Sequence, residues 1–178
     1  MLAEAQTLLP DGLQLVLLDG WRSIELQQEL YEREYAVQVA KLGRQMLSTE
    51  EEAYVAIETQ RYVSLPSLSP DVPSPHNTGG AVDVAIAMAD RLLDFGTVHD
   101  DMSERSSLTY CETNDLLGAE ARSNRRMLYY VMTQVGFKPY ADEWWHFNYG
   151  NQMAQMTHYY RTGEREPAVY GPGKNVVQ

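Results

Sequence analysis

The order of apolar and polar residues in the first third of the chain predicts one strand and two helices. Residues 13–18 are an apolar run that ends at Asp19 and Gly20, which predicts a buried strand followed by a turn. Ser23 then stands where a helix N-cap is expected, and apolar residues at roughly helical spacing continue over 24–46. A second helix is predicted at 49–63, because glutamates fill its first turn, where acidic side chains are favourable.

The rest of the chain alternates between irregular and periodic segments. Residues 64–80 are rich in proline and predict a rigid, irregular loop, and residues 91–113 are irregular and acidic. A strand, a helix with Gly136 just past its end, and a further strand are predicted at 81–87, 120–135 and 144–149. No repeat or linker interrupts this pattern. We therefore expect a single domain at 1–161, followed by a peripheral or disordered tail at 162–178.

Composition and charge narrow the function classes. At 178 residues, one domain is the default, and 44% hydrophobic residues is ordinary for a globular protein. The net charge of −11 argues against general binding to nucleic acid or to an anionic membrane surface, which both need clustered Lys and Arg. A small charged substrate is compatible with this charge, because it senses only the local field of its pocket.

Cysteine usage and the N-terminus bear on the compartment. The single cysteine, Cys111, excludes an intramolecular disulfide and is interpreted as a structural thiol rather than a nucleophile. The first residues lack the basic and apolar regions of a signal peptide, and no apolar run reaches the roughly 18 residues that span a bilayer. As written, the chain is expected to be cytoplasmic.

Candidate chemistry first appears where the proline-rich loop meets the predicted strand. His76 lies in the loop, two glycines turn the chain, and Asp83 stands inside an otherwise apolar strand. An ionised aspartate there is costly unless it is paired, hydrogen-bonded or bound to a metal. His and Asp are both zinc ligands. Taken alone, however, a loop histidine is usually no ligand, and a buried aspartate is more often hydrogen-bonded than metallated.

A second cluster completes a candidate ligand set. Glu143 and His146 flank two tryptophans, and His76, Asp83 and His146 together make three protein ligands, which leaves an open position as in catalytic zinc sites. Glu143 would then be free to take a proton from water. Because residues three apart in a regular strand point to opposite faces, Glu143 is expected at the strand entry or on a bulge.

Arg22 follows the first predicted strand and its turn. A guanidinium at a strand end can reach into a site and stabilise a developing oxyanion. The alternative, a surface salt bridge, would be preferred if this residue stood alone.

These residues resemble the D-Ala-D-Ala dipeptidases, a branch of the zinc DD-peptidase superfamily. The family pattern Ser-x-His-x-x-Gly-x-Ala-x-Asp matches residues 74–83, Glu-Trp-Trp-His matches 143–146, and Asp-Gly-Tyr/Trp-Arg matches 19–22. Residues 100–106 and 124–126 are similar to further family segments. The resemblance implies an α+β fold, with a small antiparallel sheet flanked by helices as in Hedgehog and DD-peptidase domains. It also implies one Zn²⁺ per chain.

Carried over by position, the resemblance implies a role for each matching residue. His76, Asp83 and His146 would hold the zinc, Glu143 would act as general base and then acid, and Arg22 would stabilise the tetrahedral intermediate. Asp100, with Asp101 as the neighbouring alternative, would pair with the free ammonium of a small D-amino-acid dipeptide, and Ser74 would contact the same end. The substrate would be D-alanyl-D-alanine.

One departure and two alternatives accompany this interpretation. Family members usually carry some tens of residues before the Asp-Gly-x-Arg strand, so we expect that this chain lacks a segment that contributes sheet and pocket. A periplasmic location is the alternative if a signal peptide belonged to that segment. A more open pocket would allow a DD- or LD-carboxypeptidase acting on longer cell-wall peptides. The other alternative is a catalytically silent zinc-binding module, against which the presence of Glu143 and Arg22 argues.

Overall fold

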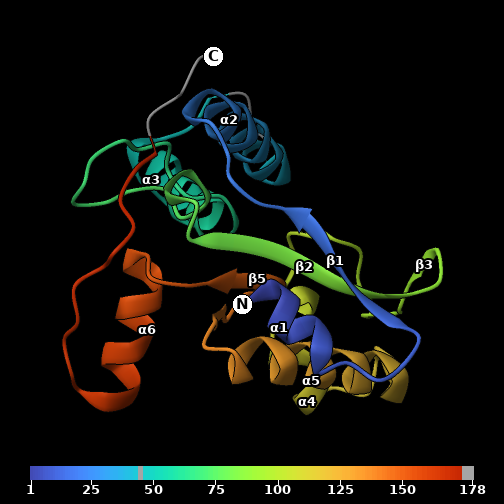
Figure 1. The fold of residues 1–178 in the computed structure, drawn as a ribbon. Helices are drawn as coiled ribbons and strands as arrows, with labels where there is room; N and C mark the ends of the chain where they lie inside the picture. Colours follow the sequence, from blue (N-terminus) through green and yellow to red (C-terminus); the bar gives the residue numbers. More distant parts are fainter. Residues whose placement is uncertain (44–45, 174–178) are drawn as a thin grey trace.

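A five-stranded antiparallel sheet forms the centre of the molecule (Figure 1). The computed structural model describes residues 1–43 and 46–173. Strands are ordered β1-β2-β5-β4, and β3 pairs with β2. The strands are β1 (Leu13–Asp19), β2 (Ala81–Met88), β3 (Arg91–Leu92), β4 (Lys138–Tyr140) and β5 (Glu143–Asn148).

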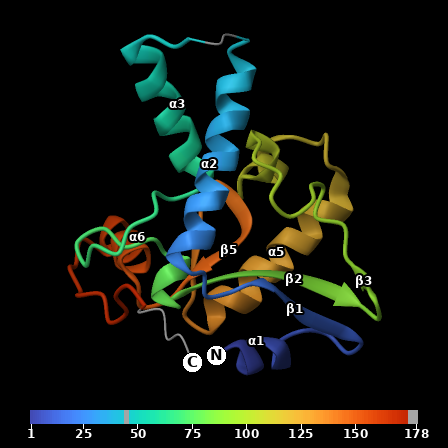
Figure 2. The same cartoon turned by 90° about the horizontal axis from the view of Figure 1, so that it is seen from above.

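Helices cover one face of the sheet and extend away from the other side (Figures 1 and 2). The α-helices are α1 (Leu2–Thr7), α2 (Ile24–Lys41), α3 (Thr49–Tyr62), α4 (Tyr110–Thr113), α5 (Gly118–Gln134) and α6 (Gln152–Thr162). Short 3-10 helices are η1 (His76–Thr78) and η2 (Glu104–Ser106). The predicted α+β class, with a small antiparallel sheet flanked by helices, is confirmed.

The core lies between the sheet and α5. Leu128 and Met132 of α5 pack with Ile86 of β2 and with Trp145 and Phe147 of β5, and all five are almost completely buried. The helix presents these residues at one face because they recur at helical spacing, while the strands contribute large side chains from the middle of the sheet. This packed layer is a rigid base for the side chains on the opposite face.

Helices α2 and α3 form an antiparallel hairpin that projects from the sheet (Figure 2). Ser23 caps α2 by accepting a hydrogen bond from the backbone N–H of Leu26, and a capping box between Ser48 and Glu51 begins α3. Both starts agree with the sequence predictions. The predicted end of α2 at Met46 is wrong, because Gly43 adopts a left-handed φ of 64° that ends the helical path.

Every predicted helix and strand has a counterpart in the structure, and the described part of the chain holds five further α-helices and strands that were not expected. The strands at 13–18, 81–87 and 144–149 correspond to β1, β2 and β5, and the helices at 24–46, 49–63 and 120–135 correspond to α2, α3 and α5. Helices α1, α4 and α6 and strands β3 and β4 were not predicted, since each is weakly patterned. Of these, β3 and α4 lie within 91–113, so the prediction of a wholly irregular segment there is wrong. Among the described residues, no helix is both long and apolar enough to cross a bilayer.

The segment after α6 returns to the body of the protein. Backbone N–H groups of Val169 and Tyr170 donate to the carbonyl oxygen of Gly150, and that of Gly173 donates to the carbonyl oxygen of Asn77. Side chains over 164–170 are exposed. The last five residues of the tail predicted at 162–178, residues 174–178, lie outside the described residues.

Strand pairing brings distant residues of the sequence together. In the β2–β5 ladder Asp83 lies opposite His146, and in the β1–β2 ladder Asp19 lies opposite Asp83. A register irregularity between Leu17 and Asp19 in β1 marks this end of the sheet. The turn at Gly20 and the loop at His76 meet at the same end.

Candidate metal centre

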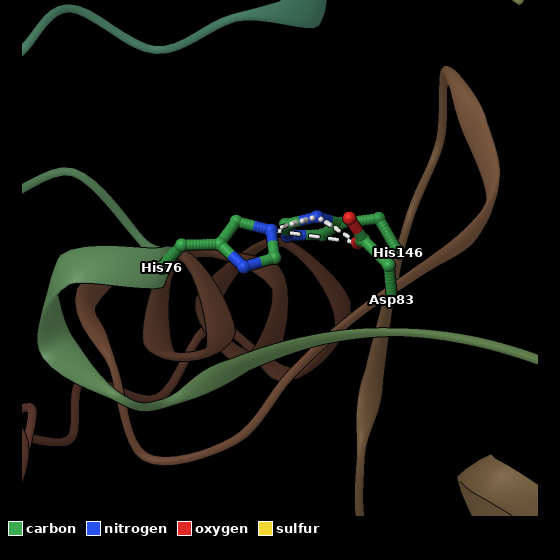
Figure 3. A group of neighbouring side chains, drawn as sticks. All are labelled: His76, Asp83 and His146. Atoms are coloured by element: carbon green, nitrogen blue, oxygen red, sulfur yellow. Dashed lines mark hydrogen bonds and ion pairs between the residues drawn. The ribbon is translucent and has the colours of Figure 1, made fainter. Parts of the chain in front are cut away.

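Two histidines and an aspartate converge at this end of the sheet (Figure 3). His76 comes from η1, Asp83 from β2 and His146 from β5. Nδ1 of His146 lies 3.0 Å from Oδ1 of Asp83 and 3.1 Å from Nε2 of His76, and Nε2 of His76 lies 3.4 Å from Oδ1 of Asp83. Within residues 1–43 and 46–173, this is the one group of three or more His, Cys or acidic side chains with such geometry.

In each histidine, the ring nitrogen that points away from the other two residues makes a hydrogen bond to the surrounding structure. Nδ1 of His76 donates to the carbonyl oxygen of Gly20 at 2.8 Å, and Nε2 of His146 donates to Oδ1 of Asn148 at 3.2 Å. Asn151 also donates to that oxygen at 2.7 Å, which identifies it as the acceptor atom of the amide. Each imidazole therefore turns a lone pair, not an N–H, toward the convergence point.

The converging atoms fit a metal ion. Three acceptors face one another, and the buried Oδ1 of Asp83 meets no hydrogen-bond donor in good geometry. Tetrahedral coordination with bonds of about 2.0 Å separates ligand atoms by about 3.3 Å. The observed separations of 3.0–3.4 Å agree with that spacing. A cation between these atoms would remove the repulsion among the lone pairs.

Asp83 is held in its ionised form. Burial favours the neutral carboxyl, but hydrogen-bond donors around it, among them His99 at its outer oxygen, outweigh burial and hold the pKa of Asp83 well below its usual range. Its outer oxygen, Oδ2, lies 3.4 Å from Nη2 of Arg22. Arg22 makes a second and shorter contact, in which its Nε lies 2.6 Å from Oδ2 of Asp19.

Glu143 lies beside the three converging residues. It is the first residue of β5, where the β4–β5 ladder changes register between Pro139 and Tyr140, so the prediction of a strand entry or bulge is confirmed. Its Oε2 lies 3.7 Å from Nδ1 of His146. Burial, reinforced by the negative charges of Asp83 and Asp100, raises the pKa of Glu143 well above its usual range. A raised pKa makes a carboxylate a stronger proton acceptor, which suits a general base.

A cavity of about 320 Å³ opens onto this cluster. Six of the seven residues singled out from the sequence line it: Arg22, His76, Asp83, Asp100, Glu143 and His146. The side chain of Asp100 is 44% exposed, and its φ of 61° is a left-handed conformation that is uncommon outside glycine. Asp101, the alternative to Asp100, does not line the cavity.

Ser74 is the predicted residue that the structure does not bring to the cavity. Its side chain is 1% exposed, donates to the carbonyl oxygen of Leu65 and accepts from the backbone N–H of Ser67 at 3.1 Å. Both hydrogen-bonding capacities of the hydroxyl are thus used to close the proline-rich loop that precedes His76.

Backbone contacts fix the two loops that carry Arg22 and His76. The backbone N–H of Arg22 donates to the carbonyl oxygen of His76, and the amide of Asn77 donates to the carbonyl oxygen of Arg22 at 3.1 Å. The indole of Trp21 donates to the carbonyl oxygen of Asn77 at 3.0 Å. These bonds between segments more than 50 residues apart hold the two loops in one geometry.

The loop at 94–107, which presents Asp100, is anchored by α5. Arg125 donates to the carbonyl oxygens of Phe95, Arg105 and Ser107 at 2.8–2.9 Å, and Asn124 donates to the carbonyl oxygen of Asp94 at 2.7 Å. A buried arginine that satisfies three carbonyl groups rigidifies irregular backbone that lacks a ladder of its own.

Sequence reasoning missed two polar residues of the site. Asn148 lies two residues after His146, and alternation along a strand places both on one face, so this signal was present in the sequence. His99 precedes Asp100 and lies 3.4 Å from Oδ2 of Asp83. No spacing rule connects His99 with Asp83, because the intervening chain includes a hairpin and an irregular loop.

Comparison with known proteins identifies the class of this fold and site. The family model described as D-ala-D-ala dipeptidase, of the peptidase M15 group, matches residues 1–162. The protein is a metallopeptidase. The chain belongs to the D-Ala-D-Ala dipeptidase family.

Several curated relatives bear the name D-alanyl-D-alanine dipeptidase. The chain is 28% identical over 169 residues to the protein of Synechocystis sp., a match that covers 88% of this chain and 68% of the relative. It is 26% identical over 167 residues to the protein of Escherichia coli, covering 93% and 68%. With the protein of Enterococcus faecium it shares 37% identity over 76 residues, covering 42% and 36%.

Among solved structures, the chain is similar to VanYB in complex with D-alanine-D-alanine. The TM-score is 0.48 at 22% identity, and the match covers 86% of this chain and 68% of that one. Family membership rests on the sequence match rather than on this partial structural likeness.

Proposed function

We propose that the chain is a zinc-dependent dipeptidase that hydrolyses D-alanyl-D-alanine and binds one Zn²⁺ through His76, Asp83 and His146. One observation carries the metal assignment. Three buried acceptor atoms face one another at 3.0–3.4 Å, and the hydrogen bonds to Gly20 and Asn148 leave no N–H pointing between them. Two nitrogen ligands and one carboxylate, with a cavity at the remaining position, favour a catalytic zinc.

The residues around this centre supply the rest of the chemistry. Zinc bound there would polarise the scissile carbonyl and lower the pKa of water. Glu143 takes a proton from the attacking water and delivers it to the leaving amine, a role that suits its raised pKa and its place beside His146. The guanidinium of Arg22 reaches the cavity and stabilises the oxyanion that develops on the substrate.

The substrate assignment rests on Asp100 and on the relatives. Asp100 lines the cavity with a half-exposed carboxylate, which suits the free ammonium group of a dipeptide. A longer peptide carries an uncharged amide at that place. The names of the curated relatives support D-Ala-D-Ala as that dipeptide.

Metal content and hydrolysis of D-Ala-D-Ala test this proposal together. Glu143→Ala is expected to retain one zinc per chain but to lose at least about 10³-fold in kcat, because general-base and acid catalysis are both removed. Glu120→Ala, at an exposed glutamate of α5, is the matched control and should behave like the parent. If Glu143→Ala hydrolysed the dipeptide at the parental rate, the proposed mechanism would be wrong.

A carboxypeptidase acting on longer cell-wall peptides is the second candidate function. A neighbouring cavity of about 700 Å³ shares Gln60, Ser64, Pro75 and Met153 with the first, so a longer chain could continue from one cavity into the other. Comparing kcat/KM for D-Ala-D-Ala with that for an N-acylated tripeptide ending in D-Ala-D-Ala separates the two. A preference for the tripeptide would favour the carboxypeptidase.

A further inference from the structure

His99 lies between two residues with different proposed tasks. Its Nε2 is 3.4 Å from Oδ2 of Asp83 and 3.5 Å from Oδ1 of Asp100. Both neighbours are carboxylates, which accept hydrogen bonds when ionised, so Nε2 carries the hydrogen. One N–H group therefore faces both the metal-binding aspartate and the aspartate proposed to receive the substrate.

The position of His99 argues against a role as a further metal ligand. Its nitrogen faces the outer oxygen of Asp83, Oδ2, whereas Oδ1 faces His76 and His146. Arg22 approaches the same outer oxygen at 3.4 Å. Two donors thus hold Oδ2, and this fixes the carboxylate plane so that Oδ1 stays directed at the other ligands.

The ring of His99 is itself held in place. It packs edge-on against Trp145, with ring centroids 5.2 Å apart and planes at 73°. It belongs to the 94–107 loop, whose backbone Arg125 and Asn124 anchor to α5. The next residue, Asp100, has the left-handed φ of 61°. Rigid neighbours of this kind keep the imidazole between the two carboxylates.

From this geometry we infer that His99 is a positioning residue that couples metal binding to recognition of the substrate's ammonium group. The inference rests on the proposed function. When the ammonium pairs with Asp100, it replaces the His99 N–H as the donor to that carboxylate. The N–H of His99 then donates only to Oδ2 of Asp83. Bound dipeptide thereby strengthens the hold on the metal, and by linkage the metal strengthens binding of the dipeptide by the same factor.

Zinc affinity, measured by competition with a chelator, tests the inference without turnover. In the Glu143→Ala chain, D-Ala-D-Ala should raise zinc affinity about 5- to 10-fold, within the usual range of coupling between sites, and the N-acetylated dipeptide, which has no ammonium, should not. His99→Phe keeps a ring against Trp145 but removes the donor. It should lower zinc affinity about tenfold and abolish the effect of the dipeptide.

Two further variants separate positioning from packing. His99→Gln retains an N–H donor and should recover zinc affinity to within about threefold of the parent, a gap of less than ~1 kcal/mol. His158→Phe, at a histidine near Glu164 and Glu166, is the matched control and should leave zinc affinity unchanged. In the catalytically active chain, His99→Phe should raise KM for D-Ala-D-Ala more than it lowers kcat.

Several results would overturn the inference. Equal losses of zinc affinity in His99→Phe and His99→Gln would show a packing role, and unchanged affinity with retained coupling in His99→Phe would show no role. If His99→Phe fails to fold, a tenfold loss of affinity in folded His99→Gln overturns it. Parental protein that binds zinc and shows the dipeptide effect, but hydrolyses nothing, would instead contradict the proposed function and leave the coupling intact.

Discussion

The metal centre and the α2–α3 hairpin meet at one cavity but are built in opposite ways. At the metal centre, the three ligands come from η1, β2 and β5, and every ligand is buried. His76 donates to the carbonyl oxygen of Gly20 in a distant segment, and His146 donates to Asn148 of its own strand.

In the hairpin, most buried polar side chains bond within their own helix: Gln38 donates to Glu34, and Thr59 donates to the carbonyl oxygen of Val55. Gln27, near the start of α2, instead donates to the carbonyl oxygen of Ser64. The first region is assembled from distant segments of the chain, and bonds within a single helix predominate in the second.

This difference bears on how each region should respond to change. A ligand set that several segments hold together loses its geometry when any one contact is removed, because no neighbour can substitute for it. A helical hairpin with mostly local bonds can lose stability while its overall form is retained. The sheet therefore carries the chemistry, and the hairpin supplies a wall of the cavity through residues such as Leu26, Gln27 and Leu30.

The largest effect is expected at a ligand. His146→Ala removes one of the three converging atoms and should reduce bound zinc to a small fraction and kcat/KM by at least about 10³-fold. Metal analysis and D-Ala-D-Ala hydrolysis measure both. His158→Ala, at a histidine outside the centre, should keep parental values. Parental zinc content in His146→Ala would remove His146 from the ligand set.

A smaller effect is expected behind the ligand. Asn148→Ala removes the acceptor that holds Nε2 of His146 and leaves the Asn151 amide short of a partner. Zinc affinity should fall about 10- to 100-fold, as is usual when such outer contacts are lost. Chelator competition provides the measurement, with Asn114→Ala, in a loop after α4, as control. A loss below twofold would mean that local packing alone orients the ring.

The smallest effect on the site is expected from the hairpin. Val55→Ala, at a completely buried position of α3, should lower the free energy of unfolding by about 2 kcal/mol. Zinc affinity should stay within about twofold, under ~0.5 kcal/mol, if the hairpin is independent of the ligand set. Ile57→Ala on the same helix, 62% exposed, should change stability by less than about 0.5 kcal/mol. A tenfold loss of zinc affinity in folded Val55→Ala would break the contrast between the two regions.

The sequence was most informative where pattern and chemistry are local. Strand β1 and the helix cap at Ser23 could be predicted from the sequence, because strand and helix signals extend over only a few residues. The three converging residues were candidates because an ionised aspartate in an apolar strand needs a partner, and the resemblance to the D-Ala-D-Ala dipeptidases singled them out. Ser74 was placed in the site by resemblance, whereas the structure engages its hydroxyl in closing the loop before His76.

The chain's own order of residues determined which side chains could bind a metal, which could exchange a proton, and that Glu143 needs an irregular strand to share a face with His146. Only the tertiary structure decided the distances among the ligands, since these depend on the pairing of β2 with β5 and on the turn at Gly20. It alone brought His99 to Asp83, because contacts between segments arise from packing and not from spacing along the chain.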